Sequence, residues 1–544
     1  MVDRSRSLIF IAGFNKLSKR TFQSVAKKIP LCLVLLGAIA FLLIWVPSWG
    51  DRQYQYIATA AVVLIAGFLA IAYTLFLSGY SRKSRLAVFI VSILAVVALA
   101  GLFRVDEVTG DLVPVLVFRW QGKANEALPL LPPSVRPASE VETLPAAPGG
   151  PARADGYDQF LGPNRDATID ETGINWDWTK SPPAELWRKP VGAGWSAFSV
   201  SGKRAVTQEQ RGPNELVVCY WLSSGEVAWS HADTARFQEV LGGVGPRATP
   251  TIAGDRVFTL GATGILNCLS LTSGSPVWAV DVLKETGCPN QGWGKSSSPL
   301  VYDGLVIVVA GGNEGGWGDC PGMVAYREQS GEEVWRSTPS EPGYCSPSVA
   351  QLAGRPQLLI LNLGSVSSHD PATGKTLWSH PWEGTQPKVT QPVPVGGDRV
   401  LLSSGYGVGA ELLAVTEGPG GSFEPRSIWK NRNLKSKFSN IVVYQGAAYG
   451  LDDGIMACID LSDGKRHWKG GRYGHGQLFL DGDKIFVLAE TGDGVVVQAS
   501  TARHTELSRH KLLDGKTWNH PALPAPYLLV RNAAEAACYR LKRD

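Results

Sequence analysis

Side chains able to bind an anion or a peptide recur from residue 195 onward, each just ahead of a cluster of small residues that usually contains proline. They are Trp195, Arg247, Lys295, Tyr344, Lys388, Gln391, Lys437, His475, Trp518 and His520. Gln210, Arg211 and the loop Asn313–Asp319 add further polar groups. Cationic, aromatic and amide groups that converge on one cavity make a site for an anionic or peptide ligand. The alternative is a solvated rim of ordinary loop residues, and residue types alone leave both interpretations open.

The sequence contains none of the common catalytic motifs. It has no G-x-S-x-G, no H-E-x-x-H and no phosphate-binding loop. Its eight cysteines include no C-x-x-C pair, no haem-attachment signature and no adjacent Cys-Cys pair. Single histidines such as His231 and His369 are expected to pack or to face solvent. We therefore predict no catalytic residue and no metal site, and we regard a binding protein as the favoured class over an enzyme.

The elements that must position these residues are built from a short repeated unit, in which a tryptophan follows a small residue after a turn with glycine. The five regular copies are Cys219–Trp229, Cys268–Trp278, Ala325–Trp335, Ser368–Trp378 and Cys458–Trp468. A looser copy runs from Ala414 to Trp429, and another from Gln498 to Ser508 has serine in the tryptophan place. Self-similarity at about 40–50 residues is typical of a propeller or an array. The cysteines in this unit are interpreted as small buried residues.

Short apolar runs separated by Gly, Asp and Pro fill the chain from Tyr157 onward, as in an antiparallel all-β array. Eight proline-cluster positions and eight turn-tryptophan positions can be counted, which predicts eight blades. The last unit lacks a tryptophan strand, whereas a spare one, Glu185–Val191 with Trp187, precedes the first unit. Because an open array would expose two sheet edges, we expect this N-terminal strand to complete the last blade and close the ring. The loops ahead of the inner strands would then line a central funnel.

The pattern small-x-Asp-x-x-(Thr/Ser)-Gly-Lys-x-x-Trp, clearest at Ser368–Trp378 and Cys458–Trp468, resembles the tryptophan-docking motif of pyrroloquinoline-quinone (PQQ) repeat propellers. That superfamily includes quinoprotein alcohol dehydrogenases and the propeller lipoprotein of the bacterial outer-membrane β-barrel assembly machinery. The segment QFLGPNRD is similar to one in bacterial membrane-anchored proteins with PQQ-like repeats. The resemblance covers residues 157–544 and implies an eight-bladed, quinoprotein-like fold. It also implies that one tryptophan of each unit packs between blades: Trp187, Trp229, Trp278, Trp335, Trp378, Trp429 and Trp468.

The family's enzymes hold PQQ with Ca²⁺, a catalytic Asp and an Arg at the quinone, usually with an adjacent pair of bonded cysteines over the cofactor. Calcium prefers six to eight oxygen ligands. The funnel loops offer few carboxylates, and the sequence has no Cys-Cys pair. We therefore predict no cofactor. PQQ with calcium, contacted by Arg247 or Lys295, is the alternative.

Three uncharged apolar runs precede the array, at residues 31–49, 57–77 and 86–103, and each is long enough to span a bilayer as a helix. Basic residues crowd positions 1–30 and recur at Arg82, Lys83 and Arg85. Such flanks face the cytoplasm, which places the N-terminus inside and the propeller outside. Residues 104–123 are mixed and suit the membrane surface, and the Pro/Ala-rich stretch that follows, up to residue 156, reads as a tether.

The combined prediction is a multi-pass protein of the inner membrane whose periplasmic propeller binds an envelope protein or peptide as a scaffold. The net charge of +4 gives no sign of a nucleic-acid partner. The alternative is a PQQ-dependent quinoprotein dehydrogenase that passes electrons to the membrane. In an oxidising compartment Cys288, Cys320 and Cys345, which lie in loops of neighbouring repeats, could supply one disulfide.

Overall fold

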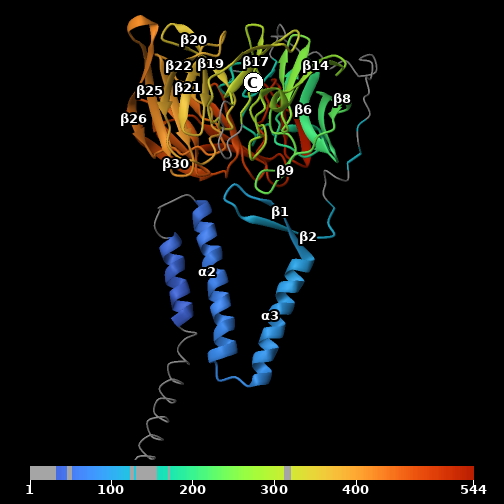
Figure 1. Ribbon diagram of the computed structural model, residues 1–544, viewed down its shortest axis with the longest axis vertical. Coiled ribbons are helices and arrows are strands. Elements are labelled where there is room, and N and C mark those ends of the chain that lie inside the picture. The colour runs from blue at the N-terminus through green and yellow to red at the C-terminus, as the bar shows by residue number, and fades with distance from the viewer. Residues whose placement is uncertain are drawn as a thin grey trace, which may run out of the picture. The chain divides into compact units, whose positions relative to one another are not determined.

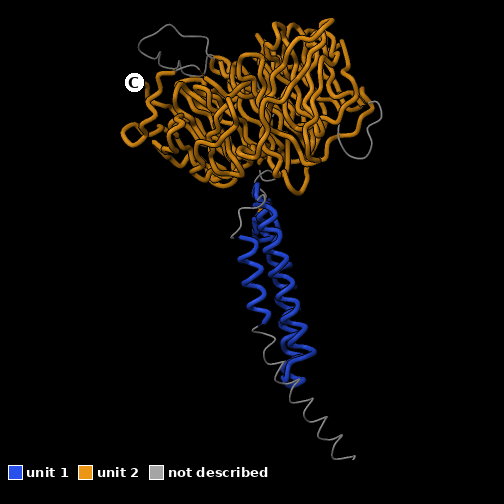
Figure 2. Tube along the Cα trace, turned by 90° about the vertical axis from the view of Figure 1, so that its left-hand side faces the viewer, with its two compact units in different colours: residues 1–121 blue, residues 122–544 orange. Residues whose placement is uncertain are grey.

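The chain divides into two compact units, Met1–Gln121 and Gly122–Asp544, which Figure 2 shows in different colours. The computed structural model describes residues 32–45, 52–122, 128–129, 131, 156–169, 172–311 and 320–544. The predicted cytoplasmic segment 1–30, most of the Pro/Ala-rich tether and the loop Asn313–Asp319 lie outside the described residues.

The described residues of the first unit form three apolar helices. They are Cys32–Trp45, α2 at Arg52–Ala72 with its π-helical continuation η1 at Tyr73–Leu77, and α3 at Arg82–Leu102. The first helix packs on α2, since Trp45 Nε1 donates to Thr59 Oγ1 at 2.9 Å. Ser81 begins α3 by accepting a hydrogen bond from Ser84 N at 3.2 Å.

Two of these helices, Arg52–Leu77 and Arg82–Leu102, are long and apolar enough to cross a membrane. The described part of the first helix, Cys32–Trp45, is shorter. The first predicted span, 31–49, continues beyond Trp45, but residues 46–50 lie outside the described residues. Length and composition therefore support two of the three predicted spans, and the count of three stays a prediction.

A two-stranded hairpin follows α3 directly. Its strands are β1 at Phe103–Val108 and β2 at Pro114–Phe118, and they pair from Phe103↔Phe118 to Val108↔Pro114. The predicted mixed segment 104–123 is thus largely this hairpin.

The second unit is a ring of eight antiparallel sheets, several of which are labelled in Figure 1. Blades 1 to 4 are β5 (Ser199–Ser201), β6 (Arg204–Arg211), β7 (Asn214–Trp221), β8 (Val227–Asp233); β11 (Thr251–Ala253), β12 (Arg256–Leu260), β13 (Ile265–Ser270), β14 (Pro276–Asp281); β15 (Leu300–Tyr302), β16 (Leu305–Val309), β17 (Met323–Arg327), β18 (Glu333–Arg336); and β19 (Ser348–Leu352), β20 (Arg355–Leu361), β21 (Ser365–His369), β22 (Thr376–Pro381). Blades 5 to 8 are β23 (Val393–Pro394), β24 (Arg399–Ser404), β25 (Gly409–Glu417), β26 (Phe423–Asn431); β27 (Val442–Tyr444), β28 (Ala447–Asp452), β29 (Ile455–Asp460), β30 (Arg466–Arg472); β31 (Gln477–Asp481), β32 (Lys484–Leu488), β33 (Asp493–Gln498), β34 (Glu506–Lys511); and β35 (Tyr527–Arg531), β36 (Glu535–Arg540) with β4 (Ala184–Pro190). Smaller elements are β3 (Thr168–Ile169), the pair β9 (Gln238–Glu239) and β10 (Gly243–Val244), α5 (Val282–Thr286) and η3 (Pro419–Gly421). The predicted all-β propeller with eight blades is confirmed.

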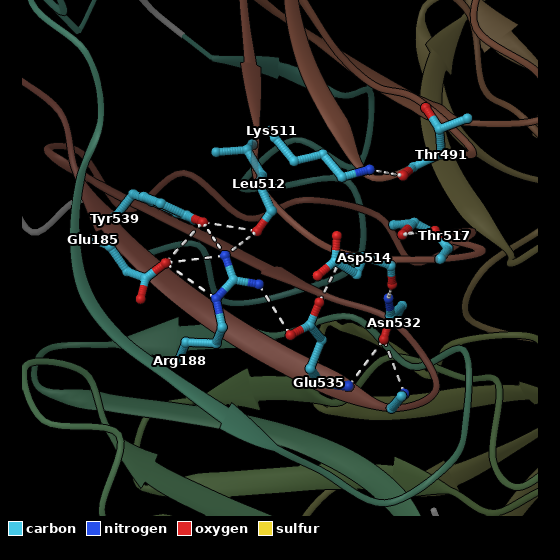
Figure 3. Close-up of polar contacts among 12 residues, drawn as sticks. Glu185, Arg188, Thr491, Lys511, Leu512, Asp514, Thr517, Asn532, Glu535 and Tyr539 are labelled. Carbon is cyan, nitrogen blue, oxygen red and sulfur yellow. Dashed lines mark hydrogen bonds and ion pairs between the residues drawn. The ribbon is translucent and has the colours of Figure 1, made fainter.

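The N-terminal strand β4 closes the ring by completing blade 8, as the sequence predicts. It pairs with β36, and Trp187 stands opposite Cys538. Figure 3 shows the polar contacts at this seam: Arg188 forms ion pairs of 3.0 Å with both Glu185 and Glu535 and donates to Leu512 O of blade 7 at 2.8 Å. The seam therefore combines strand pairing, charge pairing and a bond to the neighbouring blade.

The docking tryptophans hold neighbouring blades together. In most blades the indole nitrogen donates to the carbonyl three residues ahead of the next blade's turn glycine; Trp229, for example, donates to Leu271 O at 2.9 Å. Gly274, the glycine of that turn, lies against the Trp229 ring with φ at +71°, and a Cβ there would stand 2.4 Å from a ring carbon. Trp378 differs and donates to Gln357 Oε1 of its own blade at 2.6 Å, because the next blade has the longer, looser unit. The turn glycine is thus needed both for its backbone angle and for the flat approach of the indole.

Blade 7 has Ser508 in the tryptophan place, and a tryptophan from outside the repeats packs beside it. Ser508 Oγ accepts from Trp178 N at 3.0 Å and donates to Trp176 O at 2.7 Å. Both indoles are buried, and the Trp178 ring lies 6.0 Å from Phe486 of this blade. The segment ahead of β4 therefore supplies the aromatic packing that the blade itself lacks.

The segment Gly156–Ile169, which contains QFLGPNRD, crosses one end of the central channel. Tyr157 O accepts from Val200 N of blade 1 at 2.7 Å, and Asp158 O accepts from Ile252 N of blade 2 at 2.7 Å. The buried Arg165 donates to Pro299 O of blade 3 at 3.0 Å, while β3 pairs with β31 of blade 7. Because blades 3 and 7 stand on opposite sides of the ring, this segment spans the axis.

Candidate functional site

Loops that lead into the inner strands bring five aromatic rings into one chain of contacts. The ring centroid of Trp518 lies 5.0 Å from that of Trp195 and 5.5 Å from that of Phe438. Trp293 lies 6.2 Å from Phe438 and 5.2 Å from Tyr344. These five residues, here called the aromatic patch, come from the loops of blades 1, 8, 6, 3 and 4. Since blades 3 and 6 are not neighbours, the patch bridges loops from separate parts of the ring.

Hydrogen bonds hold the rings of the patch in place. Trp518 Nε1 donates to Glu490 Oε1 at 2.9 Å, and Trp195 Nε1 donates to Gly242 O. Tyr344 is buried, whereas the other four rings are half-buried and so reach solvent. The indole N–H groups of Trp195 and Trp518 are occupied by protein acceptors, so the partly exposed ring surfaces are what these two residues offer a ligand.

Two lysines lie against rings of the patch or beside it: Lys516 is half-buried, whereas Lys437 is buried. Lys516 Nζ lies 4.3 Å from the ring centroid of Trp518 and 4.9 Å from that of Trp195. Lys437 Nζ lies 4.5 Å from the Tyr406 ring and 5.4 Å from the Phe438 ring. At these distances the ammonium groups are attracted to the ring faces, which also fixes their charge beside the aromatic surface.

Two of the lysines predicted for the site, Lys295 and Lys388, are used inside the fold. Lys295 is fully buried and donates to Ala310 O and Gly311 O, both at 2.6 Å; burial lowers the pKa of its ammonium to about 7. Lys388 donates to Glu383 O at 2.6 Å, and burial lowers its pKa to about 8. These ammonium groups satisfy backbone carbonyls and do not line the patch.

The remaining predicted residues divide between the edge of the patch and other networks. His475 is buried with its ring 5.4 Å from Phe438, and its backbone N–H donates to Glu490 Oε2 at 3.0 Å. Arg247 stacks 4.7 Å over Phe237 and donates to Gly243 O at 3.1 Å, and burial lowers the pKa of its guanidinium.

Gln391, Gln210, Arg211 and His520 lie in buried polar networks. Gln391 donates to Ser346 O at 3.0 Å and Gln210 to Ala235 O at 2.9 Å, which ties blades and loops together. Arg211 pairs with Glu209 at 2.7 Å and donates to Pro129 O of the tether at 3.0 Å. His520 lies 3.0 Å from Leu478 O and 2.8 Å from Pro521 O, and burial lowers its pKa to about 4. None of these four contributes a ring or a charge to the patch.

Sequence reasoning missed three residues of this site: Trp293, Phe438 and Lys516. Each stands within two residues of a predicted one, beside Lys295, Lys437 and Trp518 respectively. The signal available was therefore aromatic density in the loops ahead of the inner strands. The residue types do not encode the direction of each side chain, which is what separates the patch from the buried lysines.

A separate cavity of about 720 Å³ lies at the junction of blades 7 and 8, away from the patch. The residues Thr172–Asp177, the turn Asp481–Lys484, Leu507, Ser508 and Asp544 line it. None of the residues of the aromatic patch lines this cavity, and its walls come from blade 7, the segment Thr172–Asp177 and Asp544.

The residues around the patch do not fit a calcium-held PQQ. Among the described residues no three His, Cys, Asp or Glu side chains gather in a metal-binding arrangement. The nearby carboxylates are already committed: Glu490 to His475 N and Trp518, and Glu239 to the backbone of Leu241 and Gly242. Calcium needs six to eight oxygen ligands, which these groups do not supply together.

The structure therefore defines an eight-bladed, tryptophan-docked β-propeller with an aromatic patch over its channel. The family model described as outer membrane protein assembly factor BamB (PQQ_2) matches residues 178–286 and 213–470, more than half of the chain. The chain belongs to this family, which confirms the resemblance found in the sequence. A comparison with curated proteins found no match.

Solved structures with a similar fold include BamB from Moraxella catarrhalis. It is 15% identical with a TM-score of 0.48, and the match covers 66% of this chain and 99% of that one. The quinohemoprotein alcohol dehydrogenase from Comamonas testosteroni is 13% identical with a TM-score of 0.49 and covers 72% of this chain and 81% of that one. At such low identity the likeness concerns the fold alone.

Proposed function

We propose that the protein is a membrane-anchored propeller that binds an extracytoplasmic protein or peptide segment at its aromatic patch and so acts as a scaffold in the cell envelope. The observation that carries the proposal is the chain of rings from Trp195 to Tyr344. Partly exposed tryptophan and phenylalanine side chains held in fixed positions are typical of the centre of a binding surface.

The chemistry of the patch favours a segment with apolar or aromatic side chains and some negative charge. The rings offer flat apolar contact, and the indoles of Trp195 and Trp518 do so at little cost in side-chain entropy because hydrogen bonds already hold them. Lys516 would add attraction for an acidic group at the border. The family model, named for an outer membrane assembly factor, supports an envelope protein as the partner.

Two observations support an anchor in the inner membrane with the propeller on the extracytoplasmic side. Arg52–Leu77 and Arg82–Leu102 are suited to cross a bilayer, and the basic flank Arg82–Arg85 favours a cytoplasmic turn between them. Cys288 and Cys320 form a disulfide, one of the pairings that the sequence leaves open, whereas Cys345 is a buried free thiol. Structural disulfides form and persist in oxidising compartments.

The proposal is tested by site-specific photo-cross-linking in native membranes. A photoreactive phenylalanine analogue replaces Phe438 of the patch or, as a matched control, Ile428 of β26, which is 47% exposed. The expected result is a discrete cross-linked protein at position 438 and none at 428. Equal patterns at both positions, or none at either with folded protein in the membrane, would contradict a binding role for the patch.

An absorbance spectrum distinguishes the alternative function, a quinoprotein dehydrogenase, from the proposed scaffold. The purified protein is mixed with PQQ and Ca²⁺, and quinone absorbance and dye-linked alcohol oxidation are recorded. A stoichiometric quinone signal with turnover would replace the scaffold by an enzyme. We expect neither, because no ligand set for the calcium is assembled by the described residues.

A further inference from the structure

The hairpin of β1 and β2 has one wholly apolar face. Phe103 pairs with Phe118 and Val105 with Leu116, and both pairs share a face because alternate residues of a strand point the same way. Trp120 joins them: its ring stacks 4.6 Å from Phe118, which itself stacks 4.7 Å from Phe103.

This apolar face is uncovered within its unit. Val105 is 54% exposed, Leu116 57%, Phe118 43% and Trp120 69%. A lone two-stranded hairpin is marginal in water, and an exposed patch of large apolar side chains marks an interaction surface.

The hairpin is joined rigidly to the end of α3. Arg119 N donates to Leu102 O at 2.9 Å, and Arg119 Nε donates to Ala100 O at 2.7 Å. The residue that follows β2 is thus hydrogen-bonded to the last turn of α3. The opposite face carries Arg104, which donates to Gln121 O at 2.9 Å. Arg104 also forms an ion pair of 3.3 Å with Asp106, and the acidic residues Glu107 and Asp111 lie closer to the hairpin tip.

We infer that this hairpin lies in the lipid interface, with its apolar face against the acyl-chain boundary and its arginines at the level of the lipid phosphates. The inference rests on the proposed membrane anchoring by α3, since a helix that ends at Leu102 delivers Phe103 to the interface. Tryptophan and other aromatic side chains favour that layer, and arginine suits phosphate. The unpaired outer edges of a two-stranded sheet exclude it from the hydrocarbon core, where they would lack hydrogen-bond partners.

The hairpin would thus set the depth of the chain at the membrane exit. An amphipathic element at the interface resists both withdrawal and deeper insertion of the helix to which it is bonded. Its occupant is the bilayer; the alternatives, the protein's own propeller or another protein, are outcomes of the test.

The test uses the full chain in vesicles of phosphatidylcholine and phosphatidylglycerol, in a Cys32→Ser background. Cys32 is the exposed free cysteine among the described residues, and the other free cysteines are buried. An environment-sensitive fluorophore is attached at Leu116→Cys or Val117→Cys, neighbours on opposite faces of β2. Lipids with a quencher near the headgroup should quench the probe at 116 at least about twofold more strongly than the probe at 117. A second pair, Trp120→Cys and Asp111→Cys, repeats the comparison between base and tip.

The outcomes separate this inference from the anchoring on which it rests. If the protein does not float with the vesicles, the membrane anchoring itself fails. If it floats and both faces are quenched equally, or the 116 probe is shielded from lipid and from aqueous iodide alike, the hairpin is not a lipid-facing element. Protease resistance of the propeller in each variant verifies folding.

Discussion

Arg188 Nη2 donates a hydrogen bond to Tyr539 Oη at 2.7 Å, although 351 residues separate the two along the chain. Tyr539 in turn donates to Leu512 O of blade 7 at 2.7 Å. The pair shows that ring closure depends on side chains that reach across two blades as well as on the strand register of β4 and β36.

Trp187→Ala is expected to destabilise the closing seam. The variant removes a buried indole that stacks on Gly225 and donates to Leu222 O at 2.9 Å, a loss of about 3–5 kcal/mol for a buried tryptophan. Thermal unfolding of the full chain in detergent measures the loss, and hydrogen exchange should rise first in β4 and β36. Trp229→Ala is the matched control, because its seam joins blades that are consecutive in the chain. If hydrogen exchange rises equally in all blades of both variants, the pairing of β4 with β36 is as stable as that of the other strands, and the prediction is wrong.

Ser508→Trp, although it restores the repeat, is expected to destabilise the protein by about 1–3 kcal/mol. The buried indoles of Trp176 and Trp178 lie beside Ser508, whose hydroxyl is bonded to the main-chain N of Trp178 and the main-chain O of Trp176. Differential scanning calorimetry of this variant and of Trp178→Ala gives the comparison. The double variant should recover part of the loss. A gain in stability from Ser508→Trp alone would mean that Trp178 does not occupy the docking place.

The protein is expected to lose stability on acidification through His520. Burial lowers the pKa of this imidazole to about 4 in the folded state, below its ordinary value of 6.5. The unfolded chain therefore binds the proton first as the pH falls. This contribution to stability is complete above about pH 6.5 and is lost toward pH 4, on the order of 3 kcal/mol. Urea unfolding between pH 4 and 7 measures it, and His520→Gln should flatten the slope; an unchanged slope would assign acid sensitivity to other groups.

Reduction of the Cys288–Cys320 bond is expected to cost about 2–4 kcal/mol, because the bond closes a loop with a sequence separation of 32. The melting temperature should fall on addition of dithiothreitol. Cys288→Ser should have the lower value from the start and show no response to the reductant. A reductant response that survives in the variant would point to another bond.

The repeat made the ring predictable, because the tryptophan, the small residue and the turn glycine recur together and each has one packing role. Trp187 and Cys538 could be matched for the same reason. Trp178 could not be placed, because a single tryptophan outside the repeats carries no period. Arg165 also lies outside the repeats, so no sequence period predicted its hydrogen bond to Pro299 O of blade 3.

The candidate site was predictable only in outline. Of the predicted residues, Trp195 and Trp518 contact each other in the loops ahead of the inner strands, and Tyr344 contacts Trp293. Lys295 occupies an equivalent loop position but turns inward to Ala310 O. Long irregular loops also let Trp293 reach Phe438 across the ring, and no repeat period encodes that reach.

The pairing of β4 with β36 also has a consequence for biosynthesis. The strand that completes blade 8 is made before any blade, and its partner is made after all the others. During synthesis β4 and blade 1 must therefore wait with open edges until the last strand arrives. A truncated or stalled chain can build individual blades but cannot close the ring, and it leaves an exposed edge that proteases and chaperones can recognise.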